Sequence, residues 1–188
     1  YLIEEVTAPI WNILKEKIVV SVAAGWNFSK YEAIMPAGSR LICTIPHTPV
    51  AGGEGIIVCE NRHSLTEEDY QAFEELFSSI AVIQPVETSQ LSVAGTLSGC
   101  GPAFASMFIE ALADGAVKHG LPRAAAYRLA SQMIAGTGKL QLQTGTHPGA
   151  MKDAVCSPGG TTIVGVSVLE EKGFRAAVID AIDAIESK

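Results

Sequence analysis

The 188-residue sequence predicts a chain of two parts, an α/β segment followed by an all-α segment. Three observations lead to this fold class. Short β-branched runs alternate with a helical pattern in the first 87 residues, no run with strand character follows residue 88, and the later half places Ala and Gly at helical spacing. We therefore expect domains at residues 1–87 and 88–188, with the boundary between Pro85 and Ser89.

The first part should contain four short strands, at residues 18–22, 40–45, 55–59 and 81–83. The first of these is apolar and β-branched, which is typical of a buried parallel strand. An amphipathic helix should lie between the third and fourth strands, with Thr66 as its N-cap and three acidic residues in its first turn. Strands that alternate with a helix indicate part of an open α/β sheet.

The second part should contain five helices, with the first two at 102–119 and 122–143, a short third that begins at Pro148, and the last two at 161–172 and 174–187. Proline fits the first turn of the first three helices, and glycine ends the first and the fourth. Small residues spaced along these helices allow close backbone approach. That packing can serve the core of one chain or an interface between subunits, and the limited core of so small a helical segment favours the interface.

Composition and charge exclude several classes of protein. The chain is 48% apolar and 18% charged, which is a globular composition. A net charge of −7 argues against nucleic acid or an anionic membrane as the main partner. The longest uncharged window, residues 88–109, could span a bilayer, but Gly99–Pro102 interrupts it and about half of it is polar or small, so we expect no membrane span.

The ends of the chain and its cysteines add three expectations. The first five residues have no basic segment of a signal peptide, and the absence of an initiator Met suggests that the natural N-terminus lies upstream. The four cysteines form no C-x-x-C pair, so we expect reduced thiols. The four histidines are scattered along the sequence, so we expect no metal site.

Three short segments are candidates for ligand binding. Residues 156–162 place two glycines and two threonines at the start of a helix, which suits a small anion such as a carboxylate, although a plain capping turn remains open. Residues 22–25 follow a strand where open α/β sheets bind ligands, or they form a simple turn. His47 follows the second strand, where it either titrates near neutral pH as part of a site or is a solvated side chain.

The run from His147 to Ile163, followed by Val168-Leu169-Glu170 and Gly173-Phe174-Arg175, closely resembles the signature of pyrroline-5-carboxylate reductases. Supporting segments lie at 20–25, 98–104, 111–115 and 120–123, so the resemblance covers almost the whole chain in order. It implies the C-terminal part of a Rossmann-type domain followed by a helical dimerisation domain. The chain then begins after the family's phosphate-binding G-x-G-x-x-G segment.

The resemblance implies an NAD(P)H-dependent reduction of 1-pyrroline-5-carboxylate to L-proline, the last step of proline biosynthesis. It implies NADPH or NADH as cofactor, a cytoplasmic location, and a homodimer or higher oligomer. Thr162 is the implied catalytic residue, because its hydroxyl would face the imine nitrogen. The implied substrate-binding residues are Ser157, Gly160, Thr161 and Thr162, and the implied cofactor-binding residues are Val22, Ala23 and Ala24.

The sequence departs from the family pattern at two places, and two other interpretations stay open. His47 stands where the family has Asn, and Gly145 or Thr146 stands where some relatives have Glu. Without a phosphate loop, these 188 residues alone should be inactive, which is also what a non-catalytic helical oligomerisation fragment predicts. A related imine or β-hydroxyacid dehydrogenase is the third interpretation, and the Ser-Pro-Gly-Gly-Thr-Thr turn argues against it.

Overall fold

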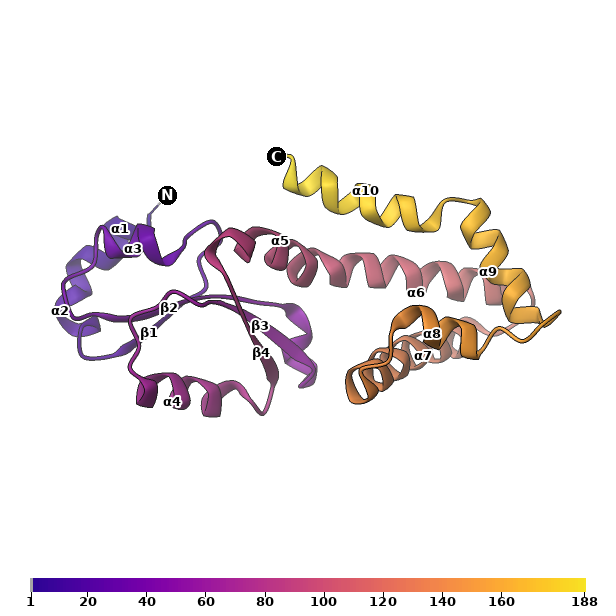
Figure 1. The fold of residues 1–188 in the computed structure, drawn as a ribbon, viewed down its shortest axis with the longest axis horizontal. Helices are drawn as coiled ribbons and strands as arrows, with labels where there is room; N and C mark the ends of the chain where they lie inside the picture. Colours follow the sequence, from indigo (N-terminus) through magenta and orange to yellow (C-terminus); the bar gives the residue numbers. More distant parts are fainter. Residues whose placement is uncertain (1) are drawn as a thin grey trace. The chain divides into compact units, whose positions relative to one another are not determined.

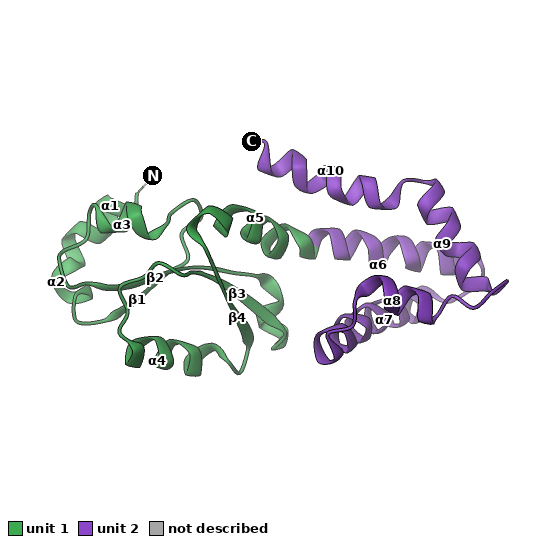
Figure 2. Ribbon diagram, viewed as in Figure 1, with its two compact units in different colours: residues 1–102 green, residues 103–188 purple. Residues whose placement is uncertain are grey.

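The computed structural model describes residues 2–188 and separates into two compact units, which meet in sequence between Pro102 and Ala103 (Figures 1 and 2). Tyr1, the first of the five residues in which we expect no signal peptide, lies outside the described residues. Every strand of the described chain lies between Ile18 and Val86, and only helices and their connections follow. The expected change from strands to helices is therefore confirmed, while the domain boundary at residues 87/88 stays a prediction.

The first unit is built on a four-stranded sheet in the order β1-β2-β3-β4. The strands are β1 (Ile18–Ser21), β2 (Arg40–Pro46), β3 (Gly55–Glu60) and β4 (Ala81–Val86). β1 is parallel to β2 and β3 is parallel to β4, but β2 and β3 are antiparallel. The connection from β2 to β3 contains only a 3₁₀ turn, Thr48–Gly52, and a parallel crossover needs a dozen or more residues.

Helices cover both faces of this sheet (Figure 1). Ile42 of β2 packs with Phe73 of α4 (Glu67–Phe77) on one face. Its neighbours Leu41 and Cys43 point the other way and pack with Trp11. That second face is covered by α1 (Ile3–Thr7), a 3₁₀ turn (Ala8–Ile10), α2 (Trp11–Leu14) and α3 (Phe28–Glu32). The alternation along β2 is the period of two expected of a strand that is buried on both sides.

Helix α4 begins where the sequence predicts. Thr66 is its N-cap, and its hydroxyl accepts the N–H of Asp69 at 3.1 Å. The Asp69 carboxylate accepts the N–H of Thr66 at 3.2 Å, which completes a capping box, and it also pairs with Arg40 at 2.8 Å.

A helical run connects the sheet to the second unit. It begins with a 3₁₀ turn (Thr88–Gln90), continues through α5 (Leu91–Gly95) and a π-helical turn (Thr96–Cys100), and enters α6 (Gly101–Lys118). Within the described residues, Thr88–Lys118 is the one run that is long and apolar enough to cross a membrane, by length and composition alone. A helix that is covered by another protein surface can be equally long and equally apolar.

The second unit contains the five helices that the sequence predicts. They are α6, α7 (Arg123–Thr144), α8 (Pro148–Ala154), α9 (Thr161–Glu171) and α10 (Phe174–Glu186). Between residues 103 and 188 only three residues are buried, and all three are alanines: Ala113, Ala126 and Ala130. Large apolar side chains of these helices are exposed instead, including Met107 at 68% and Leu142 at 78%. A single copy of this unit therefore buries very little apolar surface.

Candidate functional site

A cleft of about 650 Å³ lies in the first unit, beside the carboxyl ends of β1 and β2. Three segments line it: the loop from Val22 to Asn27, the end of β2 at Ile45 and Pro46, and the helical segment from Thr88 to Cys100. The three residues predicted to bind cofactor, Val22, Ala23 and Ala24, all line this cleft. Its position agrees with the rule that open α/β sheets bind ligands at the carboxyl ends of their strands.

The loop after β1 is held in one shape by its own hydrogen bonds. The Ser21 hydroxyl accepts the N–H of Ala23 at 3.3 Å, and the N–H of Trp26 donates to the Ala23 carbonyl at 3.2 Å. Gly25 makes the turn possible because its φ is +75°, a conformation that other residues rarely adopt. Val22 is left 64% exposed, so the loop offers a small apolar surface at the cleft.

The opposite wall of the cleft carries small polar side chains at a spacing of four residues. Thr88, Ser92, Thr96 and Cys100 all line it, which places them along one side of the helical run. Thr96 and Cys100 belong to the π-helical turn, a feature that is frequent at functional sites. This wall is not among the ligand-binding segments that the sequence predicts. The signal that predicts it is the four-residue repeat of hydroxyl and thiol side chains within the uncharged window.

His47 does not line the cleft. Its Nδ1 accepts the N–H of Ile56 at 3.1 Å, so the side chain ties the residue after β2 to β3. Because Nδ1 is the acceptor, the neutral ring carries its proton on Nε2. The structure therefore gives His47 a role in holding two strands together, which neither of the two expectations anticipated.

The predicted anion-binding turn lies in the second unit, at the start of α9. The N–H of Gly160 donates to the carbonyl of Ser157 at 3.0 Å, and Gly159 has a φ of +69°. Gly160 is the N-cap of α9 and has no side chain, so no side-chain cap satisfies the first N–H groups of the helix. Thr161 and Thr162 are exposed there. These free N–H groups, two hydroxyls and the helix dipole suit a small anion.

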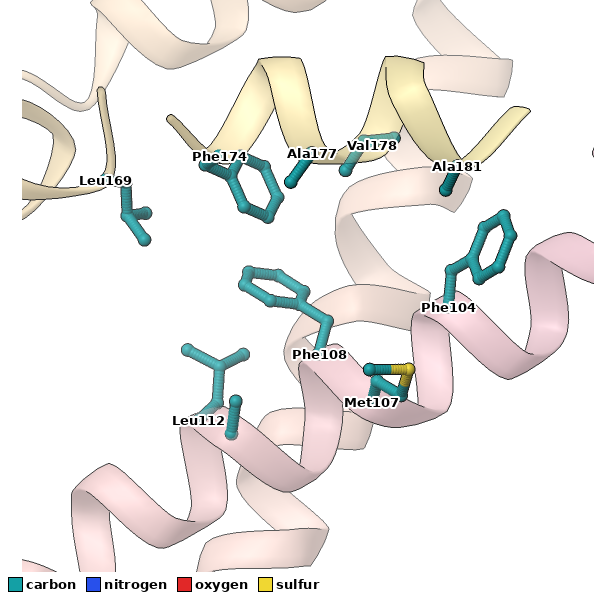
Figure 3. Close-up of a pocket in the computed structure, with 10 residues that line it drawn as sticks. Phe104, Met107, Phe108, Leu112, Leu169, Phe174, Ala177, Val178 and Ala181 are labelled. Carbon is teal, nitrogen blue, oxygen red and sulfur yellow. The ribbon is translucent and has the colours of Figure 1, made fainter. Parts of the chain in front are cut away.

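The second unit also contains an apolar groove of about 510 Å³ (Figure 3). Its lining comes from α6, α9 and α10, and Figure 3 shows Phe108 of α6 and Phe174 at the start of α10 facing each other. Their ring centroids lie 5.6 Å apart. Every residue that lines the groove is apolar, and Met107 and Val178 are 68% and 44% exposed.

The cysteines are free thiols, with Cys43 and Cys59 buried and Cys100 and Cys156 half-buried. Across residues 2–188, no group of three or more His, Cys, Asp or Glu side chains comes together in a way that could hold a metal ion.

Comparison with known proteins matches the family model described as "Pyrroline-5-carboxylate reductase dimerisation" to residues 88–188. The chain is 44% identical over 172 residues to the pyrroline-5-carboxylate reductase of Treponema pallidum, covering 89% of this chain and 65% of that protein. It is 40% identical over 181 residues to that of Escherichia coli, covering 96% of this chain and 66% of the relative. The chain thus spans just under two thirds of the length of these relatives.

Solved structures show the same fold. The crystal structure of Plasmodium falciparum pyrroline carboxylate reductase with NADP bound matches with a TM-score of 0.86 and 30% identity, covering 98% of this chain and 74% of that one. A pyrroline-5-carboxylate reductase from Coxiella burnetii matches with a TM-score of 0.88 and 27% identity, covering 98% and 69%. The expected fold class, Rossmann-type α/β followed by a helical dimerisation domain, is confirmed. The chain belongs to the pyrroline-5-carboxylate reductase family.

Proposed function

We propose that the whole protein reduces 1-pyrroline-5-carboxylate to L-proline with NADPH or NADH, as the last step of proline biosynthesis in the cytoplasm. The observation that carries this proposal is the cleft at the carboxyl ends of β1 and β2. All three residues expected to bind cofactor line it, and the Plasmodium relative that shares the fold is described with NADP bound. In this proposal residues 1–87 belong to the dinucleotide-binding domain, and residues 88–188 form the dimerisation and substrate domain.

The cleft suits the nicotinamide end of such a cofactor. Val22 offers apolar surface to a flat ring, and the small side chains of Ala23 and Ala24 allow a ligand to approach the backbone. The hydroxyl of Ser92 lies on the other wall, where a carboxamide can be hydrogen-bonded. When bound, the dihydronicotinamide supplies the hydride that reduces the carbon of the cyclic imine.

The turn before α9 suits the substrate carboxylate. Ser157 and Gly160 set the turn, and the N–H groups and hydroxyls of Thr161 and Thr162 donate to the carboxylate. The hydroxyl of Thr162 faces the imine nitrogen and can relay a proton to it. These residues orient the imine, and orientation supplies most of the rate acceleration in a reaction of this kind.

The protein also works as a homodimer or a higher oligomer in this proposal. One copy of the second unit buries only three alanines and leaves the apolar groove between α6 and α10 open. The family model that matches residues 88–188 is named for dimerisation. A second copy would cover this apolar surface, which a unit with so small a core cannot bury by itself.

The test is a steady-state assay of the whole protein that follows oxidation of NADPH or NADH with pyrroline-5-carboxylate. We expect turnover that depends on both substrates. Turnover of a β-hydroxy acid with the oxidised cofactor, and none of the imine, would support the related dehydrogenase instead. Self-association with no turnover of either compound would support the interpretation that the chain serves oligomerisation and has no catalytic role.

A further inference from the structure

Glu60, at the end of β3, is fully buried, which is unusual for an acidic residue. Its carboxylate is satisfied by two short hydrogen bonds. Oε2 accepts the backbone N–H of Phe28 at 2.6 Å, and Oε1 accepts the hydroxyl of Thr88 at 2.6 Å. Burial of a polar group is tolerated when its oxygens are hydrogen-bonded in this way.

One partner of Glu60 lines the cleft, and the other lies directly after the loop that lines its other wall. Phe28 follows Asn27, the last residue of the loop that begins at Val22 and lines one wall. Thr88 itself lines the other wall, at the foot of the helical run. The two partners lie 32 and 28 residues from Glu60 in the sequence, so one carboxylate connects two segments that are far apart in the chain.

The Cys43 thiol also lies against the Glu60 carboxylate and forms a hydrogen bond with it. Burial, together with the nearby carboxylate, raises the pKa of the Cys43 thiol to about 12. Cys43 is therefore uncharged at neutral pH. Arg62 lies over the ring of Phe28 in α3, but it is exposed and pairs with Glu32 rather than with Glu60.

We propose that Glu60 is a positioning residue for the cofactor cleft, which fixes the separation of its two walls by binding the Phe28 N–H and the Thr88 hydroxyl at once. The inference rests on the proposed function, because the cleft is taken as the nicotinamide site. Glu60 does not line the cleft and acts only through its two partners. Its loss should weaken cofactor binding and leave imine binding unchanged.

Two substitutions of Glu60 separate this role from a general effect on stability. Glu60→Ala leaves two donors without an acceptor. Glu60→Gln keeps one oxygen for the Phe28 N–H, and its amide can donate to the Thr88 oxygen, so it restores both links. In the whole enzyme we expect Glu60→Ala to raise the KM for NADPH about tenfold or more, because it removes two short hydrogen bonds and leaves both donors unsatisfied. Glu60→Gln should return the KM to within about threefold of wild type.

Thr88 provides a second test if Glu60→Ala does not fold. Thr88→Val removes the hydroxyl and keeps the shape, whereas Thr88→Ser keeps the hydroxyl. We expect the valine variant to raise the KM for NADPH and the serine variant to resemble wild type. Because Glu60 and Thr88 share one bond, the effects of Glu60→Ala and Thr88→Val on this KM should not be additive in the double variant.

Asn61→Ala is the matched control. Asn61 follows Glu60 and donates to Glu87 at 2.8 Å, so it ties the end of β3 to the residue before Thr88, but it makes no bond to the loop after β1, and the pair is exposed and does not line the cleft. The control should leave both KM values within twofold of wild type. A further readout is hydrogen–deuterium exchange in residues 22–28, which should become faster in Glu60→Ala and stay unchanged in Asn61→Ala.

The outcomes distinguish this inference from the proposed function. If wild type reduces the imine but Glu60→Ala and Thr88→Val have the wild-type KM for NADPH, only the inference is wrong. The same conclusion follows if these variants melt earlier with no change in that KM. If wild type neither binds NADPH nor reduces the imine, the proposed function is wrong, and unchanged exchange in residues 22–28 would then also contradict the link through Glu60.

Discussion

At the residue scale, the hydroxyl of Thr162 is the group with the most specific proposed role. Thr162→Val keeps the shape of the side chain and removes the hydroxyl that we propose binds the substrate. In the whole enzyme we expect kcat/KM for the imine to fall about 10- to 100-fold, equivalent to roughly 1.4–2.7 kcal/mol. The KM for the cofactor should change little. Thr162→Ser, which keeps the hydroxyl, is the control. If steady-state kinetics give the two variants the same kcat/KM for the imine, the turn is a plain helix cap and not a substrate site.

Gly160 owes its place in the turn to the absence of a Cβ atom. A Cβ there would lie 2.5 Å from the Ser157 hydroxyl oxygen and 3.1 Å from the Ser157 carbonyl oxygen. Gly160→Ala should therefore displace Ser157 and raise the KM for the imine, by about tenfold if one charge-assisted hydrogen bond is lost. Gly165→Ala is the control on the same helix, because a Cβ at Gly165 meets no atom within 4 Å. Equal imine KM values for the two variants would contradict this account.

At the scale of elements, the start of β3 depends on Gly55. A Cβ there would lie 2.7 Å from the carbonyl oxygen of Ile80 and 2.9 Å from the Cα of Val50, and neither backbone atom can move cheaply. We expect Gly55→Ala to lower the free energy of unfolding by about 1–3 kcal/mol. Gly52→Ala, where a Cβ meets nothing within 4 Å, should change it by less than about 1 kcal/mol. Urea unfolding followed by circular dichroism measures both.

The capping box of α4 makes part of the stability depend on pH. Burial opposes ionisation of Asp69, but hydrogen bonds from Thr66 and the charge of Arg40 outweigh it and hold the pKa of Asp69 below its usual value. A lowered folded-state pKa means that the stabilisation is present above the unfolded pKa of about 3.9 and is lost as the pH falls through the folded value.

We therefore expect Asp69→Asn to be less stable than wild type at pH 7, and the difference to shrink as the pH falls below about 4. Denaturant unfolding at a series of pH values measures this. The exposed Glu171, paired with Lys172, offers a control: Glu171→Gln should have little effect at any of these pH values. A constant difference between wild type and Asp69→Asn down to pH 2 would contradict the proposed contribution of the carboxylate.

At the scale of the whole molecule, the exposed apolar surface of the second unit predicts self-association. We expect a dimer interface that buries well over about 2,000 Å², the obligate class. Met107→Lys places a charge in the apolar groove and should shift the protein toward monomer. Val82→Lys is the control, because it makes the same kind of change at an exposed residue of β4 in the first unit. It should leave the oligomeric state unchanged. Sedimentation velocity at micromolar concentration measures the oligomeric state of each protein. A stable wild-type monomer would overturn the prediction.

The sequence alone determined the elements whose signals are local. Four strands and five C-terminal helices were expected within a few residues of their observed ends, because β-branched runs, proline at helix starts and glycine at helix ends act over short distances. The N-cap at Thr66 was expected for the same reason. The short helices α3 and α5 and the π-helical turn were not, since segments this short owe their shape to packing rather than to propensity.

Tertiary structure alone decided which of these elements meet. The antiparallel pairing of β2 and β3 follows from the short connection between them, which the separate strand patterns do not contain. In the sequence alone, Glu60 is an ordinary charged residue at the end of a predicted strand. Only folding buries it and brings it against Phe28 and Thr88, each about thirty residues away. Local patterns specify strands and helices, but burial and long-range hydrogen bonds exist only once those elements have packed together.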